Sequence, residues 1–237
     1  MLKALFLLLN AAKLGKILTT GGTILISVVA YAFVFGWKYA AGFVLLLFAH
    51  EMGHYVAARQ RGLDVGVPTF IPFVGAWIQM KQMPHDVETE AYVGFAGPYV
   101  GTLAALACYG LARYYDSELL LALSYAGCFL NLFNLIPVSP LDGGRITAII
   151  SPRVWLLGVP ILVAVFYFYP SPLLILLAIL AAPQVMKAWK YDPDAPENAY
   201  YRNVSTESRI AYGMYYLGLT GFLAVMTAKL HEQLPGL

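Results

Sequence analysis

Charged residues are scarce in this chain of 237 residues. Asp, Glu, Lys and Arg together make up 12% of it, about half the fraction of a typical water-soluble domain, whereas hydrophobic residues make up 60%. The 15 basic and 13 acidic residues nearly balance, and there is no basic stripe or glycine-rich phosphate loop, so nucleic acid is excluded as a predicted partner. A mean hydropathy of +0.68 instead predicts a chain embedded in the lipid bilayer.

Cysteine is scarce as well. Cys108 and Cys128 both lie in apolar runs, and they form neither a disulfide framework nor a CxxC metal motif.

A signal-peptidase site is lacking near the N-terminus, and the apolar stretch within residues 1–16 is too short to cross a membrane. We therefore predict that residues 1–16 form an interfacial segment at the lipid surface.

Long apolar runs are abundant. About 20 such residues suffice to span a bilayer, and the candidate runs are 17–35, 40–58, 91–112, 118–136, 154–169, 172–186 and 210–228. Prolines interrupt or flank the fifth and sixth runs, which could form one helical hairpin. The sequence predicts an all-α polytopic membrane protein with about six to seven transmembrane helices. Its predicted parts are a membrane-embedded core at 17–190 and a cytoplasmic loop with a C-terminal membrane helix at 191–237.

The distribution of lysine and arginine predicts the orientation. With seven spans and a cytoplasmic N-terminus, 12 of the 15 basic residues lie on the cytoplasmic side and three lie outside. Because cytoplasmic loops carry an excess of Lys and Arg, we expect a multi-pass protein of the cell membrane with its N-terminus in the cytoplasm.

The second apolar run contains His50-Glu51-Met52-Gly53-His54, an HExxH sequence. Residues four apart lie on one face of a helix, so His50 and His54 can both reach a single Zn²⁺, and Glu51 is placed to accept a proton from water. Two core histidines with an ion-paired glutamate are the structural alternative. Such polar groups are costly inside an apolar span, which favours the metal site.

A catalytic zinc site normally has three protein ligands and an open position. Asp142 is the candidate third ligand, because it follows a span broken by Pro137 and Pro140 and precedes Gly143 and Gly144, an irregular backbone that lipid tolerates only inside protein or beside a cavity. On spacing alone, Asp142 could equally be a helix N-cap or an ion-pair partner of Arg145.

Together, these residues resemble the site-2 protease family of intramembrane metalloproteases. The resemblance rests on HExxH in a span followed by Asn-x-x-Pro-x-Pro-x-Leu-Asp-Gly. This chain matches the second pattern at Asn134, Pro137, Leu141, Asp142 and Gly143 and departs from it at Ser139, where the family often has proline. The resemblance covers residues 40–145.

Membership of that family would imply intramembrane peptide hydrolysis with one Zn²⁺ per chain. His50, His54 and Asp142 would be the ligands, Glu51 the general base, and Asn134 a residue that holds the substrate backbone. The implied substrate is a single-span membrane protein or a signal-peptide remnant, reached through a cavity open to the cytoplasm. The asparagine that the family often has at the position of Gly101 is missing.

The connection between the second and third spans is apolar but interrupted by Gly and Pro, so it makes a poor helix. The family resemblance implies a small membrane-associated β-hairpin or re-entrant loop here. We expect residues 76–81 to offer a strand edge to an unwound substrate. The predicted substrate-binding residues are Ala76, Trp77, Ile78 and Gln79; packing without substrate contact is the alternative.

Three other functions are compatible with parts of this pattern. A membrane metal transporter could use the same ligands as a transit site, although its polar groups would normally be spread through several helices. A catalytically inactive regulator would have no need for Glu51. A zinc protease of the prenyl-protein type would take its third ligand from a glutamate on a later helix, and no later span offers a well-placed glutamate.

Overall fold

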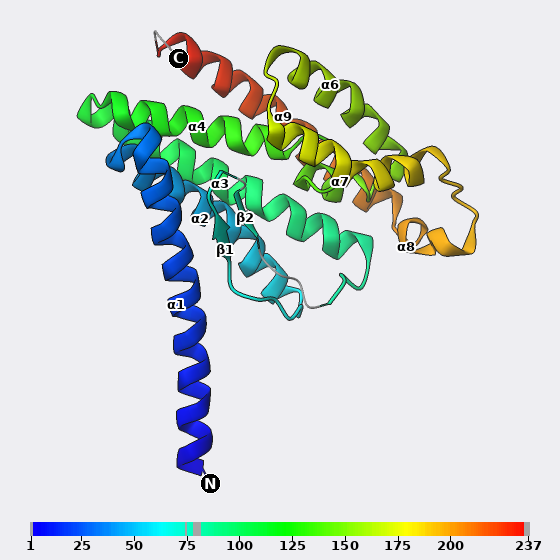
Figure 1. Ribbon diagram of the computed structural model, residues 1–237. Coiled ribbons are helices and arrows are strands. Elements are labelled where there is room, and N and C mark those ends of the chain that lie inside the picture. The colour runs from blue at the N-terminus through cyan, green and yellow to red at the C-terminus, as the bar shows by residue number, and fades with distance from the viewer. Residues whose placement is uncertain (1, 74, 78–81, 235–237) are drawn as a thin grey trace.

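The computed structural model describes residues 2–73, 75–77 and 82–234, with the backbone alone for residues 2–17 and Trp77 (Figure 1). The described chain is mostly helical, with one small sheet. Its elements are α1 (Leu2–Phe35), α2 (Trp37–Gln60), β1 (Thr69–Ile71), β2 (Gly75–Trp77), α3 (Val87–Tyr115), α4 (Glu118–Asn134), α5 (Asp142–Thr147), η1 (Pro152–Leu157), α6 (Gly158–Phe168), α7 (Pro172–Trp189), η2 (Pro196–Asn198), α8 (Ala199–Arg202) and α9 (Thr206–Glu232).

Five of the described helices are long and apolar enough to cross a membrane. They are Leu18–Phe35 within α1, α2, α3, α7 and α9. Two of the seven predicted runs form shorter apolar helices instead: α4 has 17 residues, and the predicted run 154–169 falls in the segment Pro152–Phe168, which is divided between η1 and α6. The chain is therefore an integral, multi-pass membrane protein with five candidate spans and two shorter apolar helices in its described part.

Helix α1 is continuous over 34 residues. The predicted boundary after residue 16 is therefore not marked by a break in the helix, and the interfacial position of residues 1–16 stays a prediction. The C-terminal part of α1 packs against α2 and β1, whereas its N-terminal part extends away from the other helices (Figure 1).

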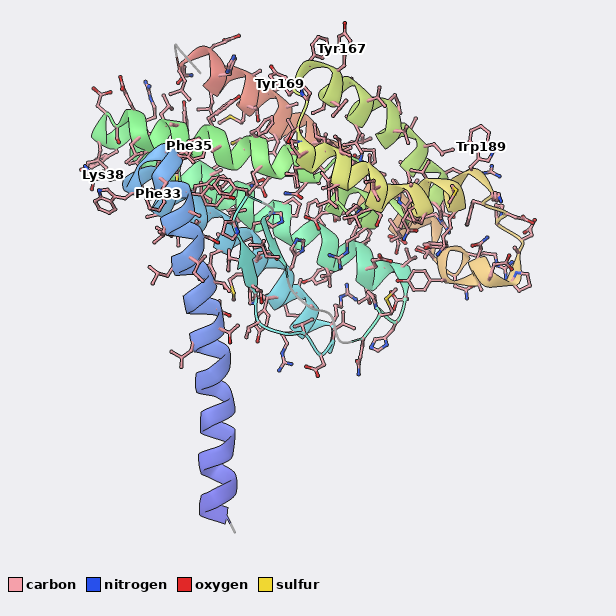
Figure 2. The ribbon with its side chains drawn as sticks, viewed as in Figure 1. Phe33, Phe35, Lys38, Tyr167, Tyr169 and Trp189 are labelled. Atoms are coloured by element: carbon pink, nitrogen blue, oxygen red, sulfur yellow. The ribbon has the colours of Figure 1, made fainter. Side chains whose placement is uncertain are left out.

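The surface of the bundle is apolar where a soluble protein would be charged. Large aromatic side chains point outward from different helices, among them Phe33 (87% exposed), Tyr167 (80%) and Trp189 (80%) (Figure 2). Exposure of so many large apolar side chains would be unfavourable in water. Their number and distribution fit a lipid-facing surface.

The helix ends follow from local sequence. Asp86 caps α3 by accepting a 2.6 Å hydrogen bond from the Thr89 backbone N–H, as expected for an acidic residue at a helix start. Gly36 has φ +83°, a conformation that lets the chain turn between α1 and α2.

Helix α2 packs along α3, and α3 packs along α4, so α3 forms the centre of the bundle. Glycines make the first of these contacts possible: a Cβ on Gly53 would overlap the carbonyl of Ala96, and a Cβ on Gly97 would overlap the His54 ring. Close backbone approach through small residues is typical of helix packing in membranes. It brings α3 directly against the HExxH segment.

The two strands pair antiparallel, with Thr69 opposite Trp77, Phe70 opposite Ala76 and Ile71 opposite Gly75. They lie between α2 and α3 in the chain, and β1 contacts α1. Two predicted substrate-binding residues, Ile78 and Gln79, lie outside the described residues.

Candidate metal centre

Helix α2 places His50, Glu51 and His54 in the interior of the protein. All three are buried, with exposed fractions of 4%, 8% and 7%. The Nε2 atoms of the two histidines lie 3.1 Å apart, one helical turn along the same face. Three groups of this polarity are unfavourable in an apolar helix unless a partner satisfies them.

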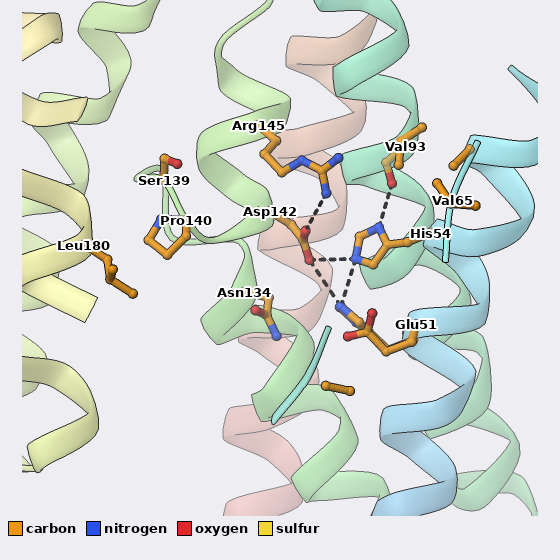
Figure 3. A pocket seen from close by; sticks show the side chains of 13 residues that line it. Glu51, His54, Val65, Val93, Asn134, Ser139, Pro140, Asp142, Arg145 and Leu180 are labelled. Atoms are coloured by element: carbon orange, nitrogen blue, oxygen red, sulfur yellow. Dashed lines mark hydrogen bonds and ion pairs between the residues drawn. The ribbon is translucent and has the colours of Figure 1, made fainter. Parts of the chain in front are cut away.

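That partner comes from 88 residues further along the chain. Helix α4 ends at Asn134, the chain turns through Pro137 and Pro140, and α5 begins at Asp142. The Oδ2 atom of Asp142 lies 3.2 Å from Nε2 of His50 and 3.2 Å from Nε2 of His54 (Figure 3). Three potential ligand atoms from two distant segments therefore meet at one point.

Two glycines and a tryptophan hold α5 in this place. A Cβ on Gly143 would overlap the carbonyl of Leu135, and a Cβ on Gly144 would overlap the backbone of Val138 and Ser139. Helix α5 thus packs directly on the backbone of the preceding loop. The Trp155 indole Nε1–H donates a 2.7 Å hydrogen bond to the Gly144 carbonyl, which anchors the other side of the helix.

Outer hydrogen bonds determine which imidazole nitrogen carries hydrogen. Nδ1 of His54 lies 2.7 Å from the Val93 carbonyl, which can only accept, so Nδ1 is the donor. Nδ1 of His50 lies 2.8 Å from Oδ1 of Asn131. The Asn131 Nδ2 group donates to the Gly127 carbonyl at 2.7 Å, which identifies Oδ1 as an acceptor toward His50.

In their neutral form, both imidazoles therefore present the lone pair of Nε2 to the centre of the cluster. The Asp142 carboxylate adds a third acceptor, so the three atoms would repel one another without a cation or a proton between them. Around a zinc ion with bonds of about 2.05 Å, tetrahedral ligand atoms lie about 3.3 Å apart. The observed separations of 3.1–3.2 Å fit that spacing, and the donor set of two imidazoles and one carboxylate fits a catalytic zinc site.

A cavity of about 540 Å³ opens on the cluster. His50, Glu51, His54 and Asp142 all line it. The remaining lining residues come from several elements and include Ala76, Asn134, Arg145 and Leu180. The Glu51 carboxylate points into this space beside the cluster, and Arg145 Nη1 lies 3.7 Å from Oδ1 of Asp142 (Figure 3). The cluster thus borders a space large enough for water.

The predicted site residues fall into three groups. His50, Glu51, His54 and Asp142 meet at the cavity, and Asn134 and Ala76 also line it. Trp77 belongs to β2 by its backbone. Ile78 and Gln79 lie outside the described residues. The N-cap alternative for Asp142 is wrong, because Leu141 occupies the N-cap position of α5 and no side chain caps the helix. The ion-pair alternative coexists with the cluster, because Arg145 Nη1 lies near Oδ1 of Asp142.

Sequence reasoning missed two outer contacts of the histidines. Asn131 was given no role, although an amide within an apolar helix is a signal that the residue has a buried polar partner. The Val93 carbonyl carried no signal, because any residue has a backbone carbonyl. Both contacts depend on how α3 and α4 pack beside α2.

Comparison with known proteins points in the same direction. Residues 38–117 match the family model of Peptidase family M50, a segment that includes HExxH and ends before Asp142. Zinc metalloprotease MJ0392 of Methanocaldococcus jannaschii is 33% identical over 124 residues, covering 48% of this chain and 36% of the relative. "Probable zinc metalloprotease EGY1, chloroplastic" of Arabidopsis thaliana is 25% identical over 153 residues, covering 45% and 28%.

The chain spans about a third of the length of these curated relatives. The predicted resemblance to the site-2 protease family is confirmed by the family match and by the names of the relatives. Those names also agree with a metal cluster that could bind one ion.

Proposed function

We propose that this chain, which matches Peptidase family M50, is an intramembrane zinc metalloprotease. One observation carries the proposal: two imidazole lone pairs and a carboxylate oxygen, all buried, converge within 3.2 Å of one another beside a cavity. A single cation at this point would satisfy all three groups, and their ligand types are those of catalytic zinc.

His50, His54 and Asp142 would hold the ion. When bound, zinc supplies Lewis-acid polarisation of the scissile carbonyl and lowers the pKa of water at the open position toward ~7. Glu51 is adjacent to the first ligand and faces the same cavity. In the proposed reaction, its carboxylate accepts the proton of the attacking water and then donates it to the leaving amine.

Asn134 is proposed to hold the substrate near this site. Its side-chain Nδ2 donates to the Leu130 carbonyl at 3.0 Å, so the amide offers its oxygen as an acceptor for a substrate N–H. The residue lies at the end of α4 and lines the cavity, which supports this role.

The small sheet supports binding of an extended substrate. The Phe70 N–H donates to Thr23 Oγ1 on α1 (3.2 Å), so it points away from β2. In an antiparallel pair of this kind, the opposite residue also directs its N–H and C=O outward. Ala76 is opposite Phe70, so its backbone N–H and C=O face away from β1, and the residue also lines the cavity. Pairing there would satisfy the backbone of an unwound peptide inside the membrane.

The proposed substrate is a single-span membrane protein or a signal-peptide remnant. The proposed location is the cell membrane, with a cytoplasmic N-terminus, because in a seven-span topology that orientation places 12 of 15 basic residues on the cytoplasmic side. The ligands lie in the second half of α2, toward the end that carries Arg59 and Arg61. The cavity would then open toward the cytoplasm.

The test compares purified wild type with Glu51→Gln. Each protein is incubated with a panel of end-labelled single-span peptides, and its zinc content is measured in parallel. We expect wild type to hold one zinc per chain and to cleave, and Glu51→Gln to keep zinc while its cleavage rate falls by at least ~100-fold. Glu90→Gln is the control, because Glu90 lies on α3 and bonds to Tyr200. A wild type without zinc, or a Glu51→Gln variant as active as wild type, would overturn the proposal.

A further inference from the structure

Asn131 is almost completely buried in α4, with 1% of its surface exposed. It is absent from the residues that line the cavity, so it does not contact a substrate there. Its amide instead joins two neighbours: Oδ1 lies 2.8 Å from Nδ1 of His50, and Nδ2 lies 2.7 Å from the Gly127 carbonyl. The side chain thus acts on the cluster through His50.

The orientation of this amide follows from what each neighbour can do. The Gly127 carbonyl can only accept, so the NH₂ group must face it and the oxygen must face His50. An amide oxygen can only accept, so His50 must carry its hydrogen on Nδ1. The lone pair then lies on Nε2, the atom that points at Asp142. For His54 the same task is done by a backbone carbonyl, which leaves Asn131 as the side chain that controls a ligand tautomer.

The surrounding helices make room for this amide. A Cβ on Gly101 of α3 would overlap the amide of Asn131, with its carbon at 2.8 Å. A Cβ on Gly127 would come 2.9 Å from Cβ of Ala105 and 3.3 Å from a methyl group of Leu46. Gly101 on α3 therefore leaves the space that the Asn131 side chain fills beside His50, and Gly127, on α4 itself, lets α4 approach Ala105 of α3 and Leu46 of α2 closely.

We propose that Asn131 is a positioning residue, which holds His50 in the Nδ1–H tautomer with Nε2 directed at the metal. The inference rests on the metal site of the proposed function. Outer-shell partners of ligating histidines typically contribute ~10–100-fold to metal affinity. We expect a contribution of that size from Asn131.

The experiment measures zinc affinity by chelator competition in two variants of matched shape. Asn131→Leu has nearly the same shape but no acceptor, and its affinity should fall by ~10–100-fold. Asn131→Asp keeps an acceptor at the same place but loses the donor to Gly127, and its affinity should stay within a few-fold of wild type. Ser124→Ala is the control, because Ser124 is buried two turns earlier on α4 and does not line the cavity.

Two results would overturn the inference. Wild-type affinity in Asn131→Leu would show that the amide does not position His50. Equal losses in the Asp and Leu variants would assign the effect to packing or to the Gly127 bond. If Asn131→Leu does not fold, Gly101→Ala replaces it. The new methyl group on α3 would push the Asn131 side-chain amide away from His50, so the affinity for zinc should also fall.

Failure of the proposed function gives a different result. If wild type itself binds no zinc, the metal site is wrong, and ¹⁵N spectra of histidine-labelled protein then test Asn131 without metal. A His50 signal of the Nδ1–H tautomer in wild type, lost in Asn131→Leu, supports the positioning role. An identical tautomer in both proteins contradicts it.

Discussion

Gly97→Ala should disable the metal site by adding one methyl group. The new Cβ would lie 2.7 Å from Cδ2 of His54 and closer still to Nε2 and Cε1, whereas real Cβ atoms keep at least 3.0 Å from their neighbours. Ordinary contact begins at 3.4 Å, so the ring or helix α3 must retreat by roughly 1 Å, because packed interiors have no spare volume. Metal ligands tolerate displacements of only about 0.2 Å.

The expected loss of zinc affinity therefore exceeds the ~10–100-fold typical for an outer-shell change. Gly110→Ala is a matched control, because Gly110 lies on the same helix and a Cβ there meets nothing within 4 Å. Both changes gain about 1 kcal/mol of helix propensity, so propensity does not distinguish them. Overpacking in Gly97→Ala should cost about 1–3 kcal/mol.

Chelator competition and thermal melting of both variants in one detergent provide the assay. Gly110→Ala should match wild type in zinc affinity and melt at the same temperature or higher. Gly97→Ala should lose zinc and cleavage together. A Gly97→Ala protein with wild-type zinc affinity would refute the close approach of α3 to His54 and, with it, the geometry of the cluster.

Three further predictions use other parts of the structure. Ala76→Pro removes an N–H that points away from β1, so cleavage of single-span peptides should fall at least ~10-fold while the zinc content stays unchanged. The control Ala76→Val keeps the N–H and should retain activity. Equal activity of the two variants would contradict substrate pairing at β2. Trp155→Phe removes the hydrogen bond to the Gly144 carbonyl and should lower the unfolding free energy by about 1–3 kcal/mol, which is seen as a lower melting temperature. The control Trp189→Phe, at an 80% exposed position, should leave the melting temperature unchanged. Removing zinc with a chelator should lower the melting temperature, because free zinc at 1,000 times its Kd contributes about 4 kcal/mol; an unchanged curve would mean that the acceptor cluster does not bind the ion in the folded state.

The membrane class and half of the metal centre were predictable from local sequence. Apolar runs were sufficient to locate the helices, because length and hydropathy are properties of a segment by itself. The geometry of His50 and His54 was equally predictable, since a spacing of four fixes two side chains on one face of any helix. The exact number of spans was not predictable from the sequence, because α4 and the 152–168 segment are apolar but short.

Tertiary structure decided everything that depends on segments far apart in the chain. Asp142 was a ligand candidate only by its motif, and its place beside the histidines results from α5 packing on the 135–139 backbone. The tautomers of the two histidines depend on Asn131 and on the Val93 carbonyl, which reach them from α4 and α3. Sequence determines which groups can coordinate or donate, but their directions are set by how closely the helices approach. In this protein that approach is controlled by glycines 53, 97 and 101, where a single Cβ would leave no room.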